Sequence, residues 1–359
     1  YNNKHSDNSL TWLSCRRQTR SNHPLYESNN MSSSKFSPPT YLKNPHIQSI
    51  MNSVGPRKYL AKKITKALDS EQLIVTTELG VRLTAEFDKA DPKTRVSKNA
   101  ELVILLHGWE GSSQSAYQVT TAHHLLKQGF DVLRLNMRDH GESHHLNPEA
   151  FNSTLITEVG DAIKVFSSEQ SYKGIFLAGF SLGGNFTLRI AADRGKELNI
   201  NTAVAICPPI DPNNAMTAMN EGLFIYEKYF FRRWTGSISK KLTYFPELNF
   251  ADDLAKVKTL EDINKTFIPK FTPFPDAESY FSAYALTGDR LNALEITAYL
   301  IASEDDPILP VADVAKINHC DNLIIEKQRY GGHCGFILDT AGNSWVPQRL
   351  TEIFKQHGV

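Results

Sequence analysis

Apolar and polar positions follow two different periods along the chain from about residue 70 onward. Short continuous apolar runs predict buried strands, and segments with apolar residues every three or four positions predict helices. The predicted strands are 73–78, 81–87, 101–108, 130–136, 173–179, 201–207, 295–303 and 321–327. The predicted helices are 115–130, 154–169, 182–193 and 345–357. Only Leu79 and Gly80 separate the first two strands, which predicts a hairpin or two adjacent strands.

The repeated alternation of strand and helix predicts an α/β fold with a mostly parallel central sheet and helices on both faces. Residues 208–293 interrupt the alternation with many prolines, the aromatic run 224–234 and a helical pattern over 251–265. This segment is too long for a loop, so we expect an inserted, mainly helical cap. We expect its aromatic side chains to pack between cap and sheet, or in part to line an acyl pocket.

The ends of these patterns predict how the chain is divided. Residues 1–34 are rich in Asn and Ser and have no periodicity, which predicts a disordered leader, with Met31 a candidate native start. The core would then comprise residues 35–207 and 294–359, on either side of the cap at 208–293. No apolar run resembles a membrane span or a signal peptide.

Composition excludes some classes of partner. Thirty-nine basic residues balance thirty-nine acidic ones, so no excess charge favours a nucleic acid, and a small neutral substrate is expected. The four cysteines are far apart and form no C-x-x-C, which favours reduced thiols and a cytoplasmic protein. Peripheral membrane contact through the run 224–231 stays open, and the oligomeric state is not indicated.

Ser181 lies in a G-x-S-x-G motif between the predicted strand 173–179 and the predicted helix 182–193. Glycines on both sides allow the sharp turn that projects a serine hydroxyl into a cleft. Ser181 is therefore the expected nucleophile, and the N–H of Leu182 is one expected oxyanion donor. The alternative is that Ser181 only caps the helix.

Two further loops follow predicted strands and supply the other expected groups. The N–H of Trp109, in HGWEGS after the run ELVILL, is the second expected oxyanion donor, whereas no catalytic role is expected for Glu110. A serine hydroxyl needs a base within hydrogen-bond reach. His333 follows the strand 321–327 and has glycines on both sides, so it is the expected general base.

An orienting carboxylate is expected after the strand 295–303, where the sequence SEDDPILP follows. Asp306 precedes a proline that restricts its backbone to extended values, and it is chosen over Asp305. The order Ser181, Asp306, His333 is the order expected of this kind of sheet.

The stretch HGESHH is rich in histidine, so we weighed a metal site. No cysteine or spaced carboxylate completes a ligand pattern with His107, His140, His144 or His145. We therefore expect surface histidines there, and no metal or organic cofactor.

Several motifs resemble the α/β-hydrolase superfamily and, within it, the YheT-type subfamily. They span residues 40–357 and are NPHIQSI (44–50), LLHGWEGSSQSAY (105–117), NMRDHGES (136–143), GFSLGGN (179–185), SEDDPILP (303–310) and GGHCGF (331–336). The resemblance implies an α/β-hydrolase fold, a triad of Ser181, Asp306 and His333, and carboxylesterase or acylglycerol lipase activity. Asp139 departs from the family pattern, which usually has glycine there.

These observations predict a serine hydrolase of carboxylic esters with short or medium acyl groups, or of acylglycerols. An acyltransferase that forms the same acyl-serine is the alternative enzyme. A non-catalytic binding protein on this scaffold is the alternative outside enzymes, although all three triad residues are present.

Overall fold

The computed structural model describes residues 35–95 and 100–358, and its centre is a sheet of eight strands. The strand order is β1-β2-β4-β3-β5-β6-β7-β8. The strands are β1 (Glu71–Thr76), β2 (Arg82–Asp88), β3 (Glu101–Leu106), β4 (Asp131–Leu135), β5 (Gly174–Phe180), β6 (Ile200–Ile206), β7 (Thr297–Ser303) and β8 (Leu323–Gln328). β1 and β2 form the predicted hairpin, β2 pairs antiparallel with β4, and the other pairs are parallel.

Register brings the carboxyl ends of the parallel strands to one edge of the sheet. Leu106 pairs with Gly179, Phe180 with Ile206, and Ser303 with Gln328. β5 is buried along its whole length because helices cover both faces, which explains its continuous apolar sequence. The loops that leave this edge therefore lie close to one another.

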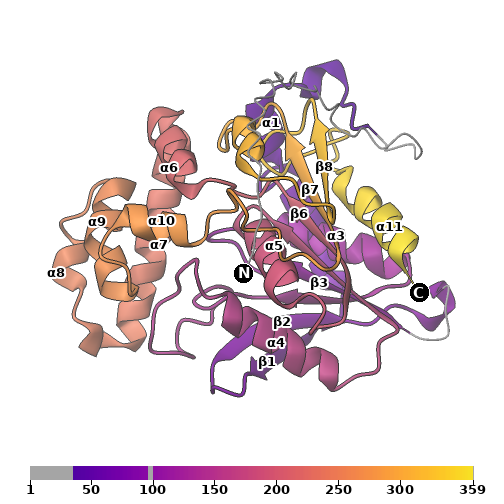
Figure 1. Cartoon of the computed structure of the whole chain (residues 1–359), viewed down its shortest axis with the longest axis horizontal. Helices are drawn as coiled ribbons and strands as arrows, with labels where there is room; N and C mark the ends of the chain where they lie inside the picture. The colour runs from indigo at the N-terminus through magenta and orange to yellow at the C-terminus, as the bar shows by residue number, and fades with distance from the viewer. Residues whose placement is uncertain (1–34, 96–99, 359) are drawn as a thin grey trace, which may run out of the picture. The chain divides into compact units, whose positions relative to one another are not determined.

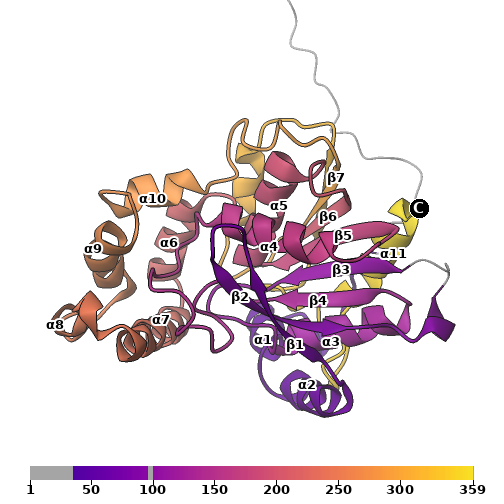
Figure 2. The ribbon, with the colours of Figure 1, turned by 90° about the horizontal axis from the view of Figure 1, so that it is seen from below.

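Helices cover the two faces of the sheet (Figures 1 and 2). α4 and α5 pack their apolar side chains on one face, and α3 and α11 pack theirs on the other. α1 and α2 precede the sheet, and α2 packs on α3. These helices are α1 (Pro45–Met51), α2 (Pro56–Ala67), α3 (Ala116–Lys127), α4 (Ile156–Ser168), α5 (Leu182–Arg194) and α11 (Val346–His357). Short 3-10 helices are Thr40–Leu42, Pro92–Thr94, Pro246–Leu248 and Val311–Lys316.

The segment between β6 and β7 is helical and lies at one end of the sheet (Figure 1). Its helices are α6 (Pro212–Glu221), α7 (Phe224–Tyr244), α8 (Ala251–Leu254), α9 (Leu260–Phe271) and α10 (Ala277–Ala283). The helical pattern over 251–265 is not one helix, because Thr259 and Asp262 form a capping box that starts α9 afresh. The aromatic run divides between two environments: Phe230 and Trp234 pack inward, whereas Phe224 and Tyr229 are exposed.

The α/β class and the mainly parallel sheet predicted from the pattern are confirmed. The division into leader, core and cap stays a prediction, and the predicted leader lies outside the described residues. Over 35–95 and 100–358, no helix combines the length and hydropathy of a membrane span.

Candidate active site

Ser181 occupies a sharp turn between β5 and α5. Its φ is 53° and its ψ is −121°, a strained backbone for a residue with a side chain. The two flanking glycines are required by close approach, since a Cβ on Gly179 would lie 2.2 Å from the Gly183 oxygen and one on Gly183 would lie 2.4 Å from the His107 oxygen. The Ser181 hydroxyl accepts no capping hydrogen bond from α5, so it is available for another partner.

That partner is His333, in the loop after β8. His333 Nε2 lies 2.9 Å from Ser181 Oγ, and its Nδ1 lies 2.8 Å from Asp306 Oδ2. The structure thus brings together the three residues predicted as a triad, in the hydrogen-bond order that general-base activation of a serine requires. Their catalytic roles stay a prediction.

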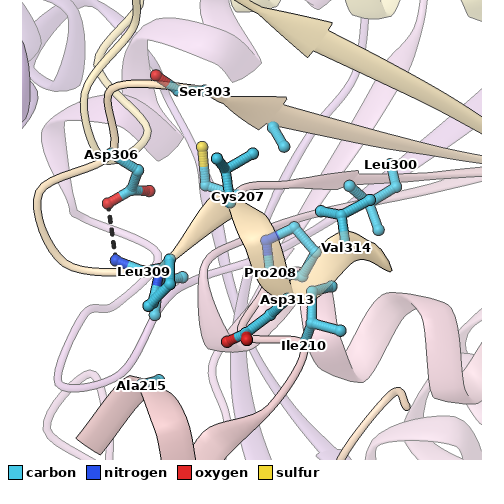
Figure 3. Close-up of a pocket in the computed structure, with 13 residues that line it drawn as sticks. Cys207, Pro208, Ile210, Ala215, Leu300, Ser303, Asp306, Leu309, Asp313 and Val314 are labelled. Carbon is cyan, nitrogen blue, oxygen red and sulfur yellow. Dashed lines mark hydrogen bonds between the residues drawn. The ribbon is translucent and has the colours of Figure 1, made fainter. Parts of the chain in front are cut away.

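Asp306 and Asp305 have separate partners. The Oδ1 atom of Asp306 accepts hydrogen bonds from the N–H groups of Ile308, at 2.9 Å, and Leu309, at 3.0 Å. Figure 3 shows the Leu309 bond at the edge of a cavity of about 20 Å³, enough for about one water molecule. Asp305 instead accepts from the N–H of Gly332 at 2.8 Å, one residue before His333. Asp306 therefore faces the imidazole, and Asp305 anchors the loop that carries it.

Two residues of α1, for which the sequence predicted no role, also hold the His333 loop. The hydroxyl of Ser49 accepts a 2.8 Å hydrogen bond from the His333 N–H and donates one of 2.7 Å to Pro45. The fully buried Gln48 side chain accepts from the Ile337 N–H at 2.6 Å and donates to the Ile337 carbonyl at 3.1 Å.

A local signal for α1 was present in the sequence. The Asn44 side chain accepts from the N–H groups of His46 and Ile47, and Pro45 occupies the first helical position. Asn followed by Pro is a typical helix start. The motif NPHIQSI thus contains both the helix start and the two side chains that hold the loop.

The two predicted oxyanion donors belong to two segments that meet at Ser181. A Cβ on Gly108 would lie 3.2 Å from the Ser181 Cβ, so the loop after β3 touches the turn. The N–H of Trp109 donates no hydrogen bond to another described residue. Leu182 is the first residue of α5, where helix geometry leaves the N–H without an intrahelical acceptor.

The expectation of surface histidines is wrong for His107, His140 and His144, which are buried. His107 Nε2 accepts from the Met137 N–H at 3.1 Å, and His140 Nε2 accepts from the Glu110 N–H at 3.2 Å. Burial lowers the pKa of His140 to about 4 and that of His107 well below its ordinary value, so both rings are neutral. Their hydrogen bonds join the loops after β3 and β4 to each other. The abundance of histidine in HGESHH does not predict this contact. No cluster suited to a metal ion occurs among the residues described.

Asp139 occupies a position where the family pattern usually has glycine, and its surroundings accommodate the larger side chain. Its φ is 58°, a conformation that favours glycine but admits Asp and Asn. Its carboxylate accepts from Lys241 Nζ of α7 at 2.8 Å and from the Phe151 N–H at 2.8 Å. The substitution therefore adds a buried ion pair between the loop after β4 and the cap helix.

The electrostatics of His333 reflect its partners. Burial alone lowers the pKa of this imidazole, but the nearby Asp306 carboxylate and the Cys334 sulfur outweigh burial and raise it well above its ordinary value. The Asp306 contact therefore stabilises the imidazolium that forms when a base accepts a proton.

Comparison with known proteins agrees with this fold. A sequence model described as the alpha/beta hydrolase fold matches residues 101–243, which contain Trp109 and Ser181. An abhydrolase domain-containing protein of Dictyostelium discoideum is 24% identical over 332 residues, covering 88% of this chain and 80% of that protein. The putative esterase YheT of Escherichia coli is 22% identical over 258 residues, covering 70% of this chain and 75% of its own.

The chain has the α/β-hydrolase fold, and residues 101–243 match the sequence model of that fold. The predicted resemblance to the α/β-hydrolase superfamily and to YheT-like proteins is confirmed. The solved esterase Pf2001 of Pyrococcus furiosus has the same α/β-hydrolase fold, with a TM-score of 0.54 and 19% identity over 82% of this chain and 94% of that one.

Proposed function

We propose that this protein is a serine hydrolase that cleaves carboxylic esters through an acyl-enzyme on Ser181. The observation that carries the proposal is the hydrogen-bond chain from Ser181 Oγ to His333 Nε2, at 2.9 Å, and from His333 Nδ1 to Asp306 Oδ2, at 2.8 Å. The α/β-hydrolase fold and the esterases among the similar proteins support ester hydrolysis in general.

The mechanism follows from this order of contacts. His333 takes the proton of the Ser181 hydroxyl as the oxygen attacks the ester carbonyl, and the N–H groups of Trp109 and Leu182 stabilise the oxyanion. His333 then protonates the leaving alcohol and activates a water molecule that cleaves the acyl-enzyme. Asp306 fixes the imidazole tautomer and stabilises the imidazolium.

The substrate we propose is a small ester with a short or medium acyl group, or an acylglycerol. The balance of charged residues supports a neutral substrate. The cytoplasmic location inferred from cysteine usage stays a prediction.

The test is hydrolysis of p-nitrophenyl esters of graded acyl length by the wild-type protein and by Ser181→Ala. We expect the substitution to lower kcat by about a thousandfold or more, because the attacking oxygen is lost. Ser168→Ala is the matched control, since this serine is exposed near the end of α4. Covalent labelling of the wild type by a fluorophosphonate should be lost in Ser181→Ala alone.

Undiminished turnover by Ser181→Ala would contradict the proposal. Absence of both turnover and labelling in the folded wild type would favour a binding protein. Ester products formed from added alcohols in preference to free acid would favour an acyltransferase.

A further inference from the structure

A cavity of about 40 Å³ lies between the cap helices and the loops after β3 and β4. Aromatic side chains from the cap, including Trp234, Phe267 and Phe271, form much of its lining. Three residues with carboxylate or ammonium side chains also line it, namely Glu110, Asp139 and Lys241. An apolar enclosure with a few polar groups is the usual form of a site that orients a small ligand.

Most of the charged groups around the cavity have partners within the protein. Asp139 accepts from Lys241 Nζ and from the Phe151 N–H, each at 2.8 Å. Lys241 also donates to the Glu149 carbonyl at 3.0 Å. His140 makes hydrogen bonds through both ring nitrogens, to the Glu110 N–H and the Arg138 carbonyl. These groups are occupied by the structure itself.

The Glu110 carboxyl group is the exception. Glu110 is only 8% exposed, and its backbone is held at both ends, by His140 at the N–H and by Arg233 at the carbonyl. Its side-chain oxygens have no hydrogen-bond or ion-pair partner among residues 35–95 and 100–358. Burial raises the pKa of this carboxyl group to about 7, with Arg233 opposing the rise and Asp139 adding to it. The Glu110 carboxyl oxygens are not among the fully buried atoms that lack a partner, so water reaches them in the cavity. A ligand group that takes the place of this water and makes the same hydrogen bonds would bind there.

The loop that carries Glu110 touches the turn that carries the proposed nucleophile. Gly108 packs against Ser181, and Glu110 follows Gly108 by two residues. Two residues span at most about 7 Å of extended chain. Glu110 also directly follows Trp109, whose N–H we propose as an oxyanion donor.

The chemistry of the cavity favours a hydroxyl group as its occupant. A hydroxyl group both donates and accepts, so it satisfies a carboxyl group in either protonation state. An ammonium group satisfies only the ionised form, and the cation Lys241 already lines the cavity. The small volume accommodates a compact polar terminus rather than a long acyl chain.

We propose that the Glu110 carboxyl group forms a specificity subsite that hydrogen-bonds to a hydroxyl group carried by the ester substrate a few bonds from its carbonyl. This inference rests on the proposed esterase function. It assigns Glu110 to substrate recognition and leaves bond cleavage to Ser181, His333 and Asp306.

The test compares matched esters in which a hydroxyl group replaces a methyl group. Ethylene glycol monobutyrate and propyl butyrate place the difference in the alcohol, and methyl ω-hydroxyhexanoate and methyl heptanoate place it in the acyl chain. We expect wild-type kcat/KM to favour the hydroxylated ester of one pair by about 10-fold or more, as for a hydrogen bond to a buried charged group. The pair that responds identifies which part of the ester occupies the subsite.

Two substitutions separate recognition from folding. Glu110→Leu should remove the preference, and Glu110→Gln should keep part of it because the amide still makes hydrogen bonds. Both variants should keep their reactivity toward a fluorophosphonate, which carries no hydroxyl group. Glu247→Gln is the matched control, since this exposed cap residue lies outside the cavity lining.

Two outcomes would overturn the inference. Ester hydrolysis with equal kcat/KM within both pairs, or a preference that both Glu110 variants retain, would overturn the subsite and leave the esterase proposal standing. A wild type that neither hydrolyses these esters nor reacts with the fluorophosphonate would overturn both.

Discussion

Asp306 and Glu110 are carboxyl groups on loops beside the same serine, and both side chains are largely buried, yet their surroundings differ. The Asp306 carboxylate accepts hydrogen bonds from two backbone N–H groups and contacts the His333 ring. The Glu110 carboxyl group has no such partner among the residues that the structure describes, although its main chain is fixed on both sides. A carboxylate with all its bonds made is preorganised to stabilise charge during a reaction. A carboxyl group without such bonds can instead hydrogen-bond to a ligand. Asp306 is therefore suited to stabilising charge during the proposed reaction, and Glu110 is suited to recognising the substrate.

The largest expected effect comes from removing the charge of Asp306. Asp306→Asn should lower kcat by about 10³- to 10⁴-fold, because the amide cannot stabilise the imidazolium or hold the required tautomer. Asp305→Asn should lower activity far less, since that residue contacts the Gly332 N–H rather than the imidazole. Steady-state kinetics on one p-nitrophenyl ester measures both. A larger loss in Asp305→Asn would reverse the assignment.

The second prediction concerns the ion pair between Asp139, in the loop after β4, and Lys241 of α7. Lys241→Met should lower the free energy of unfolding by about 3–5 kcal/mol, because it leaves the buried Asp139 carboxylate without its cation. The double variant Asp139→Gly/Lys241→Met should recover most of that loss. Urea unfolding followed by circular dichroism gives both values. A single-variant loss below about 1 kcal/mol would show that the pair matters little to the fold.

The third prediction tests the support of His333 from α1. Ser49→Ala removes the acceptor of the His333 N–H and should lower kcat about 10-fold with little change in KM. Ser49→Thr keeps a hydroxyl group and should restore most of the activity. Ser53→Ala, at an exposed position just after α1, is the control. A rise of KM by about the same factor in Ser49→Ala would instead indicate that Ser49 contributes to substrate binding.

The smallest expected effect is a shift of the pH profile along the pH axis. A base must be neutral to accept a proton, and a raised pKa of His333 lowers its neutral fraction at any given pH. The acidic limb of kcat/KM should therefore have its midpoint above about 6.5, the value for free histidine. In Asp306→Asn the midpoint of the residual activity should move to lower pH. A wild-type midpoint below that of free histidine would contradict the proposed contribution of Asp306.

Much of the sheet and its edge could be predicted because both depend on local patterns. Continuous apolar runs marked the strands, and the groups brought together at the edge follow those runs directly, as Ser181 follows β5 and Asp306 follows β7. Parallel strands then place such loops side by side whatever their separation in sequence.

The remaining features depend on long-range packing that a local pattern does not contain. Gln48 and Ser49 support a loop that lies more than 280 residues later in the sequence. His107 and His140 are buried because the loops after β3 and β4 meet. The break between α8 and α9 is local, and the Thr259 capping box was a sequence signal that could have predicted it.

The bond between Ser49 and His333 joins positions 284 residues apart, and that between Gln48 and Ile337 joins positions 289 apart. During synthesis, α1 and the turn at Ser181 are both made long before the loop that His333 occupies. Under the proposed mechanism, Ser181 gains its base only when that loop has been translated and docked on α1. A nascent or stalled chain that carries only the elements up to β7 should therefore not hydrolyse esters, and the proposed activity should arise late in the maturation of the molecule.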